Sequence, residues 1–297
     1  MRILNFGSLN LDLFYTVDHF VQAGETLSSE KLERFCGGKG LNQSIALARA
    51  GAPVWHAGCI GEDGRCLLEL LAENGVNVTY VRTSGQTSGH AVIQRDRNGQ
   101  NCILLYGGAN SQLTDAFVDE VLAGFGKGDV LLLQNEINQL DRIVDRAWER
   151  GMKIVLNPSP ANEALDRLDL SKIDTFLLNE IEGQALTGRA APDEILDELR
   201  RRYPAATIVL TLGKAGVCYD DGTLRCSHGI YDVPVADTTG AGDTFTGYYL
   251  AASTAGETPQ EALRLASVAS SLAVTKIGAA PSIPTMREVR AADLKLK

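Results

Sequence analysis

Short apolar runs alternate with amphipathic segments along most of the 297-residue chain. Near-continuous apolar runs are typical of buried parallel strands, whereas apolar residues that recur every three or four positions are typical of helices. We expect strands at residues 3–6, 54–58, 129–134, 153–156, 175–178 and 207–212, and helices that include residues 64–73 and 141–150. The pattern therefore predicts an α/β fold, with a Rossmann-like, mostly parallel sheet and helices on both faces.

Two stretches break this alternation, at residues 11–36 and 87–106. Both contain β-segments without a helix between them, and Asn98-Gly99 in the second stretch is typical of a hairpin turn. We expect these stretches to form a small β-lid over the substrate edge of one domain that spans residues 1–297. The last helix is expected to end near Lys276, before a loop rich in Pro and Gly.

Ligands of such sheets bind at the carboxyl ends of the strands, where several polar or glycine residues are expected: Asn10, Glu136, Asn157, Asn179 and Gly213. Asn10 and Asp12 are two residues apart on an extended segment, so both side chains can face one ligand. A turn pair that closes the first strand is the alternative interpretation. Glu136 follows an apolar strand and is thereby anchored near the core, which favours a functional role over that of a solvated acid.

Residues 237–247 read Asp-Thr-Thr-Gly-Ala-Gly-Asp-Thr-Phe-Thr-Gly and precede a helical pattern. Backbone amides of Gly240, Ala241 and Gly242 can close around an oxyanion or phosphate, toward which the helix directs its positive end. A carboxylate weakens such an anion site, so Asp243 should have a task of its own. We expect it to accept the proton of a hydroxyl that attacks a phosphoryl group. The alternative is a glycine-rich turn in which Asp243 caps the helix.

A second glycine-rich segment, residues 36–43, reads Cys-Gly-Gly-Lys-Gly-Leu-Asn-Gln and leads into an Ala-rich helix at residues 44–50. Glycines here let a ligand approach the backbone closely, and Lys39 and Asn42 supply donors. The segment is not a Walker A loop, because it lacks G-x-x-x-x-G-K-[ST]. Taken alone it is explained by a plain loop, but two such segments that each open a helix favour a shared site.

The segments GGKGLNQ and DTTGAGDTF together resemble the two signatures of the ribokinase-like (PfkB) carbohydrate kinases. Other landmarks follow in the family's order along essentially the whole chain: Asn10-Leu11-Asp12, Gly107-Gly108-Ala109-Asn110, Glu136, Asn179-Glu180-Ile181-Glu182 and Thr211-Leu212-Gly213-Lys214-Ala215-Gly216. The resemblance implies the family's fold with its β-lid, and an ATP-dependent kinase that phosphorylates a primary hydroxyl of a sugar. D-ribose, which would yield ribose 5-phosphate, is the favoured substrate.

Several alternatives stay open from the sequence. Another sugar such as fructose or deoxyribose, or a nucleoside, would leave the mechanism unchanged; the low aromatic content of 6% disfavours a nucleoside. A non-catalytic sugar-binding protein would be expected to have lost Asp243 or the glycines. A dinucleotide-dependent dehydrogenase is disfavoured, because no G-x-G-x-x-G follows the first strand.

The resemblance also implies roles for individual residues. The sugar would be bound by Asn10, Asp12, Gly38, Lys39, Asn42, Glu136 and Asp243, with Ala91 and Leu105 as an apolar wall of the lid. The nucleotide would be bound by Asn179, Thr211, Gly213, Lys214, Gly216, Gly242 and Ser267. Lys214 is open to a second interpretation as a solvent-exposed loop residue.

Metal ions enter through the same resemblance. Mg²⁺ would accompany ATP, and Glu182 would hold it through water, although Asn179 and Glu182 are also explained as an ordinary helix start. K⁺ would activate the enzyme from a site formed by Asp237, Thr239, Ala273, Lys276, Gly278 and Ser282, mostly through backbone carbonyls.

Composition narrows the partners. The net charge of −9 and a pI near 5.0 argue against a nucleic-acid partner. No apolar run is long enough to span a membrane, and the N-terminus lacks the features of a signal peptide. Six cysteines without a metal-binding spacing indicate a reducing cytoplasm. Isolated cysteines in apolar company are usually small core residues, and Cys36, beside the glycine-rich segment, is the one alternative candidate for a reactive thiol. The resemblance implies the remaining partners, which are a sugar, ATP and a second copy of the chain, joined through the lid.

Overall fold

The computed structural model describes residues 1–297 and contains two β-sheets. The larger sheet has nine strands in the order β13-β12-β11-β10-β9-β8-β1-β4-β5. Its strands are β1 (Ile3–Phe6), β4 (Val54–Ile60), β5 (Asn77–Thr83), β8 (Val130–Gln134), β9 (Lys153–Asn157), β10 (Thr175–Asn179), β11 (Thr207–Thr211), β12 (Val217–Asp220) and β13 (Arg225–His228). All neighbours pair in parallel except β11 with β12 and β12 with β13.

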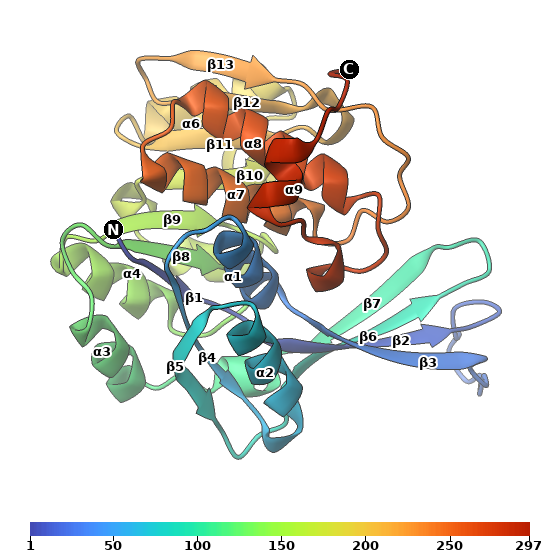
Figure 1. The fold of residues 1–297 in the computed structure, drawn as a ribbon. Coiled ribbons are helices and arrows are strands. Elements are labelled where there is room, and N and C mark those ends of the chain that lie inside the picture. Colours follow the sequence, from blue (N-terminus) through green and yellow to red (C-terminus); the bar gives the residue numbers. More distant parts are fainter.

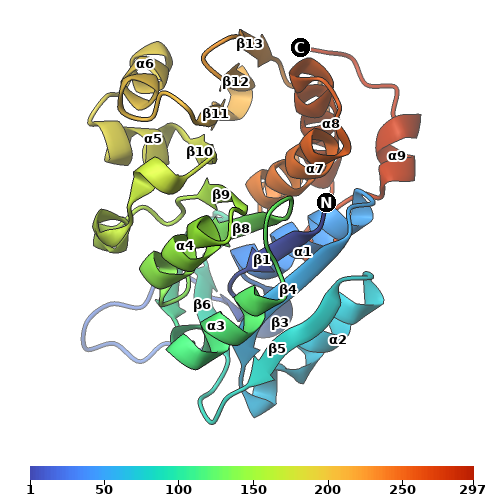
Figure 2. The ribbon, with the colours of Figure 1, turned by 90° about the vertical axis from the view of Figure 1, so that its left-hand side faces the viewer.

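Nine α-helices surround this sheet in two layers, which Figure 2 shows on either side of the strands. They are α1 (Lys39–Arg49), α2 (Arg65–Glu73), α3 (Asp115–Ala123), α4 (Leu140–Glu149), α5 (Glu180–Thr187), α6 (Pro192–Arg202), α7 (Ala241–Ala255), α8 (Pro259–Ala273) and α9 (Met286–Ala291). Helices α1, α2, α7 and α8 contribute to one apolar core, and α3, α4 and α6 contribute to the other.

Successive side chains along each buried strand pack alternately into the two cores on opposite faces of the sheet. In β8, Val130 and Leu132 belong to the core beneath α1 and α7, whereas Leu131 and Leu133 belong to the core beneath α3 and α4. Successive side chains of a strand point to opposite faces, so a strand covered on both faces needs an apolar residue at every position. This explains why the central strands are nearly continuous apolar runs.

The smaller sheet projects from the body as an arm (Figure 1). Its strands are ordered β3-β2-β6-β7 and comprise β2 (Asn10–Thr16), β3 (Lys31–Gly37), β6 (Gly89–Arg95) and β7 (Asn101–Tyr106). The two hairpins β2–β3 and β6–β7 are antiparallel, and β2 joins β6 in parallel. The predicted α/β fold with a β-lid is therefore confirmed.

Three details differ from the sequence-based expectations. Helix α1 begins at Lys39 rather than Ser44, because Gly38, with a φ of 93°, turns the chain directly into the helix. The last helix does not end near Lys276: α8 ends at Ala273, and α9 follows from Met286 to Ala291. The side chains of Thr285 and Glu288 form a capping box at the start of α9, a signal that was present in the sequence.

The structure does not favour Cys36 as a reactive thiol. Cys36 is only partly exposed, whereas Cys66 and Cys102 are exposed. Burial, with smaller contributions from Cys66 and Asp12, raises the pKa of the Cys36 thiol to about 12, so little reactive thiolate forms.

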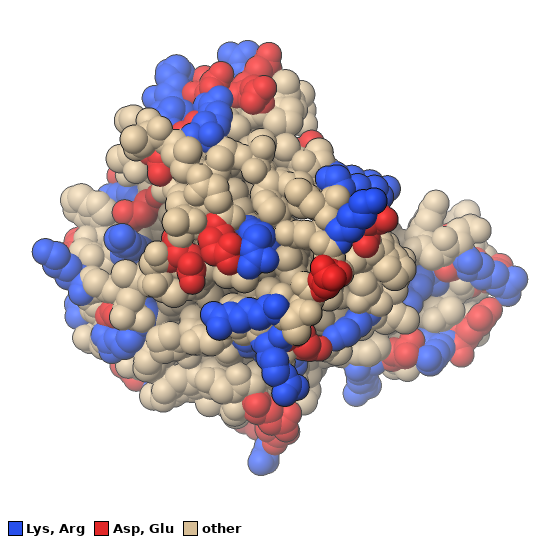
Figure 3. All heavy atoms as spheres, turned by 45° about the horizontal axis from the view of Figure 1, so that its top comes forward, with Lys and Arg blue, Asp and Glu red and all other residues tan.

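Charged side chains are mixed in sign over the face shown in Figure 3, on the body and on the arm alike. Ion pairs also join neighbouring elements, such as Arg142 of α4 with Asp115 of α3 at 3.0 Å. No helix has both the length and the apolar composition required to cross a bilayer.

Candidate active site

A cavity of about 260 Å³ lies where the carboxyl ends of β9, β10 and β11 meet the start of α7. Seven of the predicted site residues line it: Lys39, Asn179, Glu182, Thr211, Gly240, Gly242 and Asp243. Sequence reasoning did not select its other lining residues, which are Asn157, Leu177, Leu178, Thr238, Phe245 and Thr246. Asn157 follows a predicted strand, and Thr238, Phe245 and Thr246 belong to the glycine-rich segment 237–247, so the sequence carried a signal for these four.

Asp243 is buried in the first turn of α7, and α1 holds both of its carboxylate oxygens. Asn42 donates to Oδ2 at 3.0 Å, and Gln43 donates to Oδ1 at 2.9 Å. Gly240 occupies the N-cap position, which has no side-chain cap. The alternative role of Asp243 as a helix cap is therefore wrong, since its acceptors are used by side chains of another helix.

Close packing of α1 against α7 makes these contacts possible. An added Cβ at Gly247 would lie 2.3 Å from the Cβ of Ala46. Gly247 is one turn beyond Asp243, and Ala46 is one turn beyond Asn42, so the four residues share the facing sides of the two helices. Glycine at 247 therefore lets α1 come near enough for its amides to reach the carboxylate.

The turn before α7 leaves backbone donors free. The amide of Ala241 donates to the carbonyl of Thr238 at 3.2 Å, so it is not available as part of the predicted anion site. The amides of Gly240, Gly242 and Asp243 have no acceptor in the protein. Three unpaired amides at the positive end of a helix favour binding of an anion.

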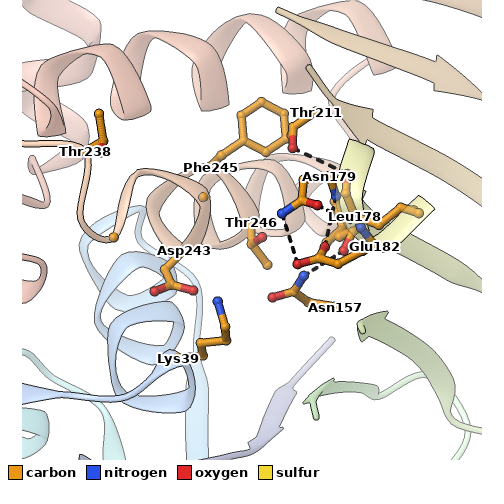
Figure 4. A pocket seen from close by; sticks show the side chains of 13 residues that line it. Lys39, Asn157, Leu178, Asn179, Glu182, Thr211, Thr238, Asp243, Phe245 and Thr246 are labelled. Carbon is orange, nitrogen blue, oxygen red and sulfur yellow. Dashed lines mark hydrogen bonds between the residues drawn. The ribbon is translucent and has the colours of Figure 1, made fainter. Parts of the chain in front are cut away.

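Lys39 adds a positive charge to the same cavity. Figure 4 shows its side chain and that of Asp243 pointing toward one another, with Asn157, Asn179 and Glu182 on the other side of the cavity. Burial lowers the pKa of Lys39, but the carboxylates of Asp243, Glu136 and Glu182 together raise it above its ordinary value. The ammonium is therefore charged, although it forms no ion pair within the protein.

Further carboxylates lie beside this cavity at the base of the lid. The amide of Lys39 donates to Glu136 at 3.2 Å, and the hydroxyl of Ser8 donates to the same oxygen at 2.5 Å. Burial raises the pKa of Asp12 to about 7, and the charges of Glu136 and Asp243 add to this effect. The structure thus brings the predicted sugar-binding acids into one electrostatic cluster around Lys39.

A second cavity, of about 310 Å³, extends from Glu136 and Asn10 to the lid strand β7. Leu105 lines it, whereas its cross-strand partner Ala91 is buried. Sequence reasoning did not assign a role to Asn110, which also lines this cavity and donates at 2.7 Å to Oδ1 of Asn10. This bond leaves the NH₂ group of Asn10 free to donate elsewhere.

Asn179 and Glu182 form a capping box at the start of α5. The Asn179 backbone donates to Glu182 at 2.9 Å, and the Glu182 amide donates to the Asn179 side chain at 3.0 Å. The alternative of a helix start is thus part of the structure, yet both side chains also line the cavity. Each Glu182 oxygen keeps an acceptor site, which fits a Mg²⁺ ion held through water.

Only some of the residues predicted to bind the nucleotide line the cavity. Thr211 and Gly242 line the cavity together with Asn179, but Gly213, Lys214, Gly216 and Ser267 do not. Lys214 is exposed in the turn after β11, where Gly213 and Gly216 have φ values of 52° and 93°. Ser267 is buried in α8.

The predicted K⁺ residues come from two loops that Asp237 ties together. Its carboxylate accepts from the Thr239 amide and from the Gly278 amide, both at 2.9 Å. Despite burial, hydrogen bonds from the Thr239 hydroxyl and from these two amides lower the pKa of Asp237, so an anionic group faces both loops. Ala273 and Ser282, which lie close to Gly278 in the sequence, are both buried. Lys276 is exposed, and its ammonium pairs with Glu288 at 3.5 Å. Lys276 could therefore serve such a site only through its backbone.

Comparisons with known proteins agree with this geometry. The profile of the family described as pfkB family carbohydrate kinase matches residues 2–286. The ribokinase of Haemophilus influenzae is 37% identical, over 95% of this chain and 95% of the relative, and that of Bacillus subtilis is 36% identical, over 97% and 98%. The structure of Arabidopsis thaliana ribokinase complexed with ribose and ATP is 30% identical, with a TM-score of 0.87 over 97% of each chain. This chain therefore belongs to the pfkB family of carbohydrate kinases, which are phosphotransferases with an alcohol acceptor.

Proposed function

We propose that this kinase transfers the γ-phosphoryl group of ATP to the 5-hydroxyl of D-ribose. The observation that carries the proposal is the cavity in which the Asp243 carboxylate, the Lys39 ammonium and the free amides at the start of α7 converge. The names of the similar proteins, and the complex of one of them with ribose and ATP, support ribose and ATP as the substrates.

Each group then has a task in the transfer. Asp243 orients the 5-hydroxyl and accepts its proton as the oxygen bonds to the γ-phosphorus. The bond from that phosphorus to the β–γ bridging oxygen breaks, and ADP leaves. Lys39 and the amides of Gly240, Gly242 and Asp243 stabilise negative charge on the migrating group. Charge stabilisation by preorganised donors is worth about 10²–10³ in rate for a single donor.

The sugar would lie between Asp243 and the carboxylates at the base of the lid. Carboxylates of Asp12 and Glu136 accept from hydroxyls, and the free NH₂ group of Asn10 donates to one. The Oδ1 atom of Asn42 is buried without a partner in this structure. A sugar hydroxyl that donates to it would remove the energetic penalty of that unpaired acceptor.

We also propose that Mg²⁺ and K⁺ take part. When bound, Mg²⁺ would neutralise charge on the ATP phosphates, and Glu182 and Asn179 are the residues that fit its water shell. K⁺ would bind between the loops that Asp237 joins and hold the turn before α7 in place. Turnover in K⁺ should exceed turnover in tetramethylammonium, and Asp237→Asn should remove that difference. Equal turnover in the two cations would contradict the K⁺ site.

A homodimer through the lid is supported by strand β7. It lies at the edge of the lid sheet, and Ile103, Leu104 and Leu105 are each more than half exposed, at 56%, 70% and 55%. An unpaired apolar edge strand tends to pair with another chain. Sedimentation equilibrium should give a dimer for the wild type and a monomer for Leu104→Lys; a wild-type monomer would contradict the proposal.

The six free cysteines support a reducing compartment such as the cytoplasm.

The test of the proposed function is ADP release from ATP and Mg²⁺ with ribose, deoxyribose, fructose, other hexoses and nucleosides as acceptors. Selective turnover of ribose is the expected result. Turnover of another acceptor would keep the transfer mechanism and replace the substrate. If no acceptor supported turnover, while calorimetry showed that ribose binds, the chain would be a binding protein with a kinase fold.

A further inference from the structure

Behind Asp243, a row of buried side-chain amides runs across the ends of three strands. It consists of Asn157 at the end of β9, Gln43 on α1, Gln134 at the end of β8 and Asn5 on β1. Gln43, Gln134 and Asn5 are completely buried, and Asn157 is 9% exposed. Buried amides in such number are uncommon unless their hydrogen bonds serve a purpose.

Backbone carbonyls at the two ends determine how these amides are turned. Asn157 donates to the carbonyl of Leu177 at 2.9 Å, which turns its own oxygen toward Gln43. At the other end, Asn5 donates to the carbonyl of Gly40 at 2.8 Å, which turns its oxygen toward Gln134. An amide has one accepting end and one donating end, so the residues between them have no freedom to flip.

Gln43 is therefore held with its NH₂ group toward Asp243. One of its hydrogens is donated to Asn157 and the other to Oδ1 of Asp243, each at 2.9 Å. Its oxygen accepts from Gln134 at 2.7 Å, and Gln134 donates its second hydrogen to Asn5 at 2.9 Å. Rotation of Gln43 by half a turn would set its oxygen against the carboxylate and break three bonds at once.

The two donors to Asp243 differ in what else they can do. Asn42, which donates to Oδ2, has an unpaired oxygen and lies in the segment expected to contact the sugar. The donors and the acceptor of the Gln43 side-chain amide are, by contrast, all used within the protein. Its contact with Asp243 therefore does not depend on a ligand.

We infer that Gln43 is a positioning residue, which aims the Asp243 carboxylate at the substrate hydroxyl and is itself held in place by Gln134 and Asn157. The inference rests on the proposed function of Asp243 as the proton acceptor. Displacement of a reacting group by about 1 Å can reduce a rate about 10²-fold. Loss of this contact should therefore lower kcat, while sugar binding, to which Asn10, Asp12 and Glu136 also contribute, should change little.

Two variants of Gln43 test this inference. Gln43→Glu keeps the shape but sets an oxygen against Asp243, and Gln43→Leu removes the contact without adding charge. We expect kcat to fall about 10²-fold in both, with the KM for ribose within about 3-fold of the wild-type value. Asn74→Leu is the matched control for Gln43→Leu, because Asn74 is an amide that joins Arg49 to the carbonyl of Leu70 and lines neither cavity. Asn74→Leu removes both hydrogen bonds, so it should lower thermal stability but leave kcat unchanged.

Two results would overturn the inference. One is a folded Gln43→Leu protein whose kcat is within about 2-fold of the wild-type value. The other is a comparable loss of kcat in Asn74→Leu, which would assign the effect to general destabilisation. If Gln43→Glu does not fold, Gln43→Leu is sufficient, since it buries no extra charge.

A crystal structure of Gln43→Leu separates this inference from the proposed function. We expect the Asp243 carboxylate to rotate away from its position against α1, whatever the wild-type protein phosphorylates. An unchanged carboxylate would refute the positioning role even if the variant were inactive. Absence of wild-type turnover with any acceptor would instead refute the proposed function.

Discussion

Asp12 shows how strongly the surroundings of one residue can set its chemistry. An added Cβ on Gly37 would lie 2.0 Å from Oδ2 of Asp12, so the glycine makes room for this carboxylate at the edge of the lid. Burial, followed by the charges of Glu136 and Asp243, raises the pKa of Asp12 to about 7. The residue therefore changes charge in the range in which enzymes usually work.

The ionisation of Asp12 should affect its proposed contact with the sugar. The ionised form of Asp12 accepts hydroxyl hydrogen bonds at both oxygens, whereas the protonated form must use one oxygen as a donor. Since Asp12 ionises as the pH rises, the KM for ribose should fall on going from pH 6 to pH 8. Asp12→Asn should have a higher KM with little dependence on pH over this range. A KM in the wild type that is constant or rises with pH would contradict the role of Asp12.

At the scale of single residues, the sequence was most informative where the site is local. Asp243 and the glycines before it lie within four consecutive positions, and the geometry of one helix start determines their arrangement. The contact of Gln43 with Asp243 could not be predicted, because it joins residues 200 positions apart. Its partner Gln134 reads in the sequence as the polar end of an apolar strand, with nothing to indicate which chain segment it meets.

At the scale of elements, the crossing of α1 and α7 determines the position of Asp243, the proposed proton acceptor. The sequence predicted helices after both glycine motifs but not that they pack together at Gly247. A Cβ there would also lie 2.9 Å from the backbone of Ala46 and of Leu47, so even alanine must push the helices apart.

Gly247→Ala should therefore affect both stability and catalysis. Overpacking of this kind costs about 1–3 kcal/mol of unfolding free energy. The contacts from Asn42 and Gln43 to Asp243, one turn away, should lengthen, so kcat should fall more than KM rises. Denaturant unfolding and steady-state kinetics measure the two effects, and Ala46→Gly in the same chain should recover part of both. Gly85→Ala is the control, since nothing lies within 4 Å of its added Cβ. Unchanged stability in Gly247→Ala would show that the helices tolerate separation.

At the scale of the whole molecule, the polar network behind Asp243, which includes Asn5 and Gln43, extends to His56 in β4. Ser44 lies 2.8 Å from Nδ1 of His56, and Nε2 lies 3.2 Å from the carbonyl of Gly7. Burial lowers the pKa of this completely buried histidine to about 4, against a small opposing effect of the Gly7 carbonyl. A neutral ring that donates from Nε2 and accepts at Nδ1 satisfies both contacts.

The folded protein should consequently lose stability in mild acid. Below about pH 6.5 the unfolded chain protonates His56, whereas the folded chain does so only near pH 4. The contribution of neutral His56 to the free energy of unfolding is complete above about pH 6.5. It decreases as the pH falls from there to about 4, by about 3 kcal/mol in total. Denaturant unfolding at several pH values should show a smaller acid-side loss for His56→Gln than for the wild type. An identical pH dependence in the two proteins would contradict the assignment.

Partly exposed His19 provides the control for that measurement. Its ring donates hydrogen bonds to the carboxylates of Glu25 and Asp18, which raise its pKa, so it contributes stability at acid pH rather than removing it. His19→Gln should therefore not reduce the acid-side loss.

The fold as a whole could be predicted from the sequence, because the continuous apolar runs of the central strands indicate that both faces of the sheet are buried. The lid was accessible because residues 11–36 and 87–106 lack helices. The parallel pairing of β2 with β6, which joins the two lid hairpins, was not predicted, since nothing in either strand specifies its neighbour. Helix α9 was missed for a different reason: its six residues are too few for a periodic pattern to stand out.

The most direct test of the account is a single-turnover measurement of phosphoryl transfer from ATP to D-ribose by the wild type and by Asp243→Asn. Sugar binding to both proteins would be measured by calorimetry. The account predicts that the wild type forms ribose 5-phosphate, that the variant is slower by about 10²–10⁴-fold, and that both bind ribose with similar affinity. A variant that transfers the phosphoryl group at nearly the wild-type rate would contradict the assignment of Asp243 as the proton acceptor.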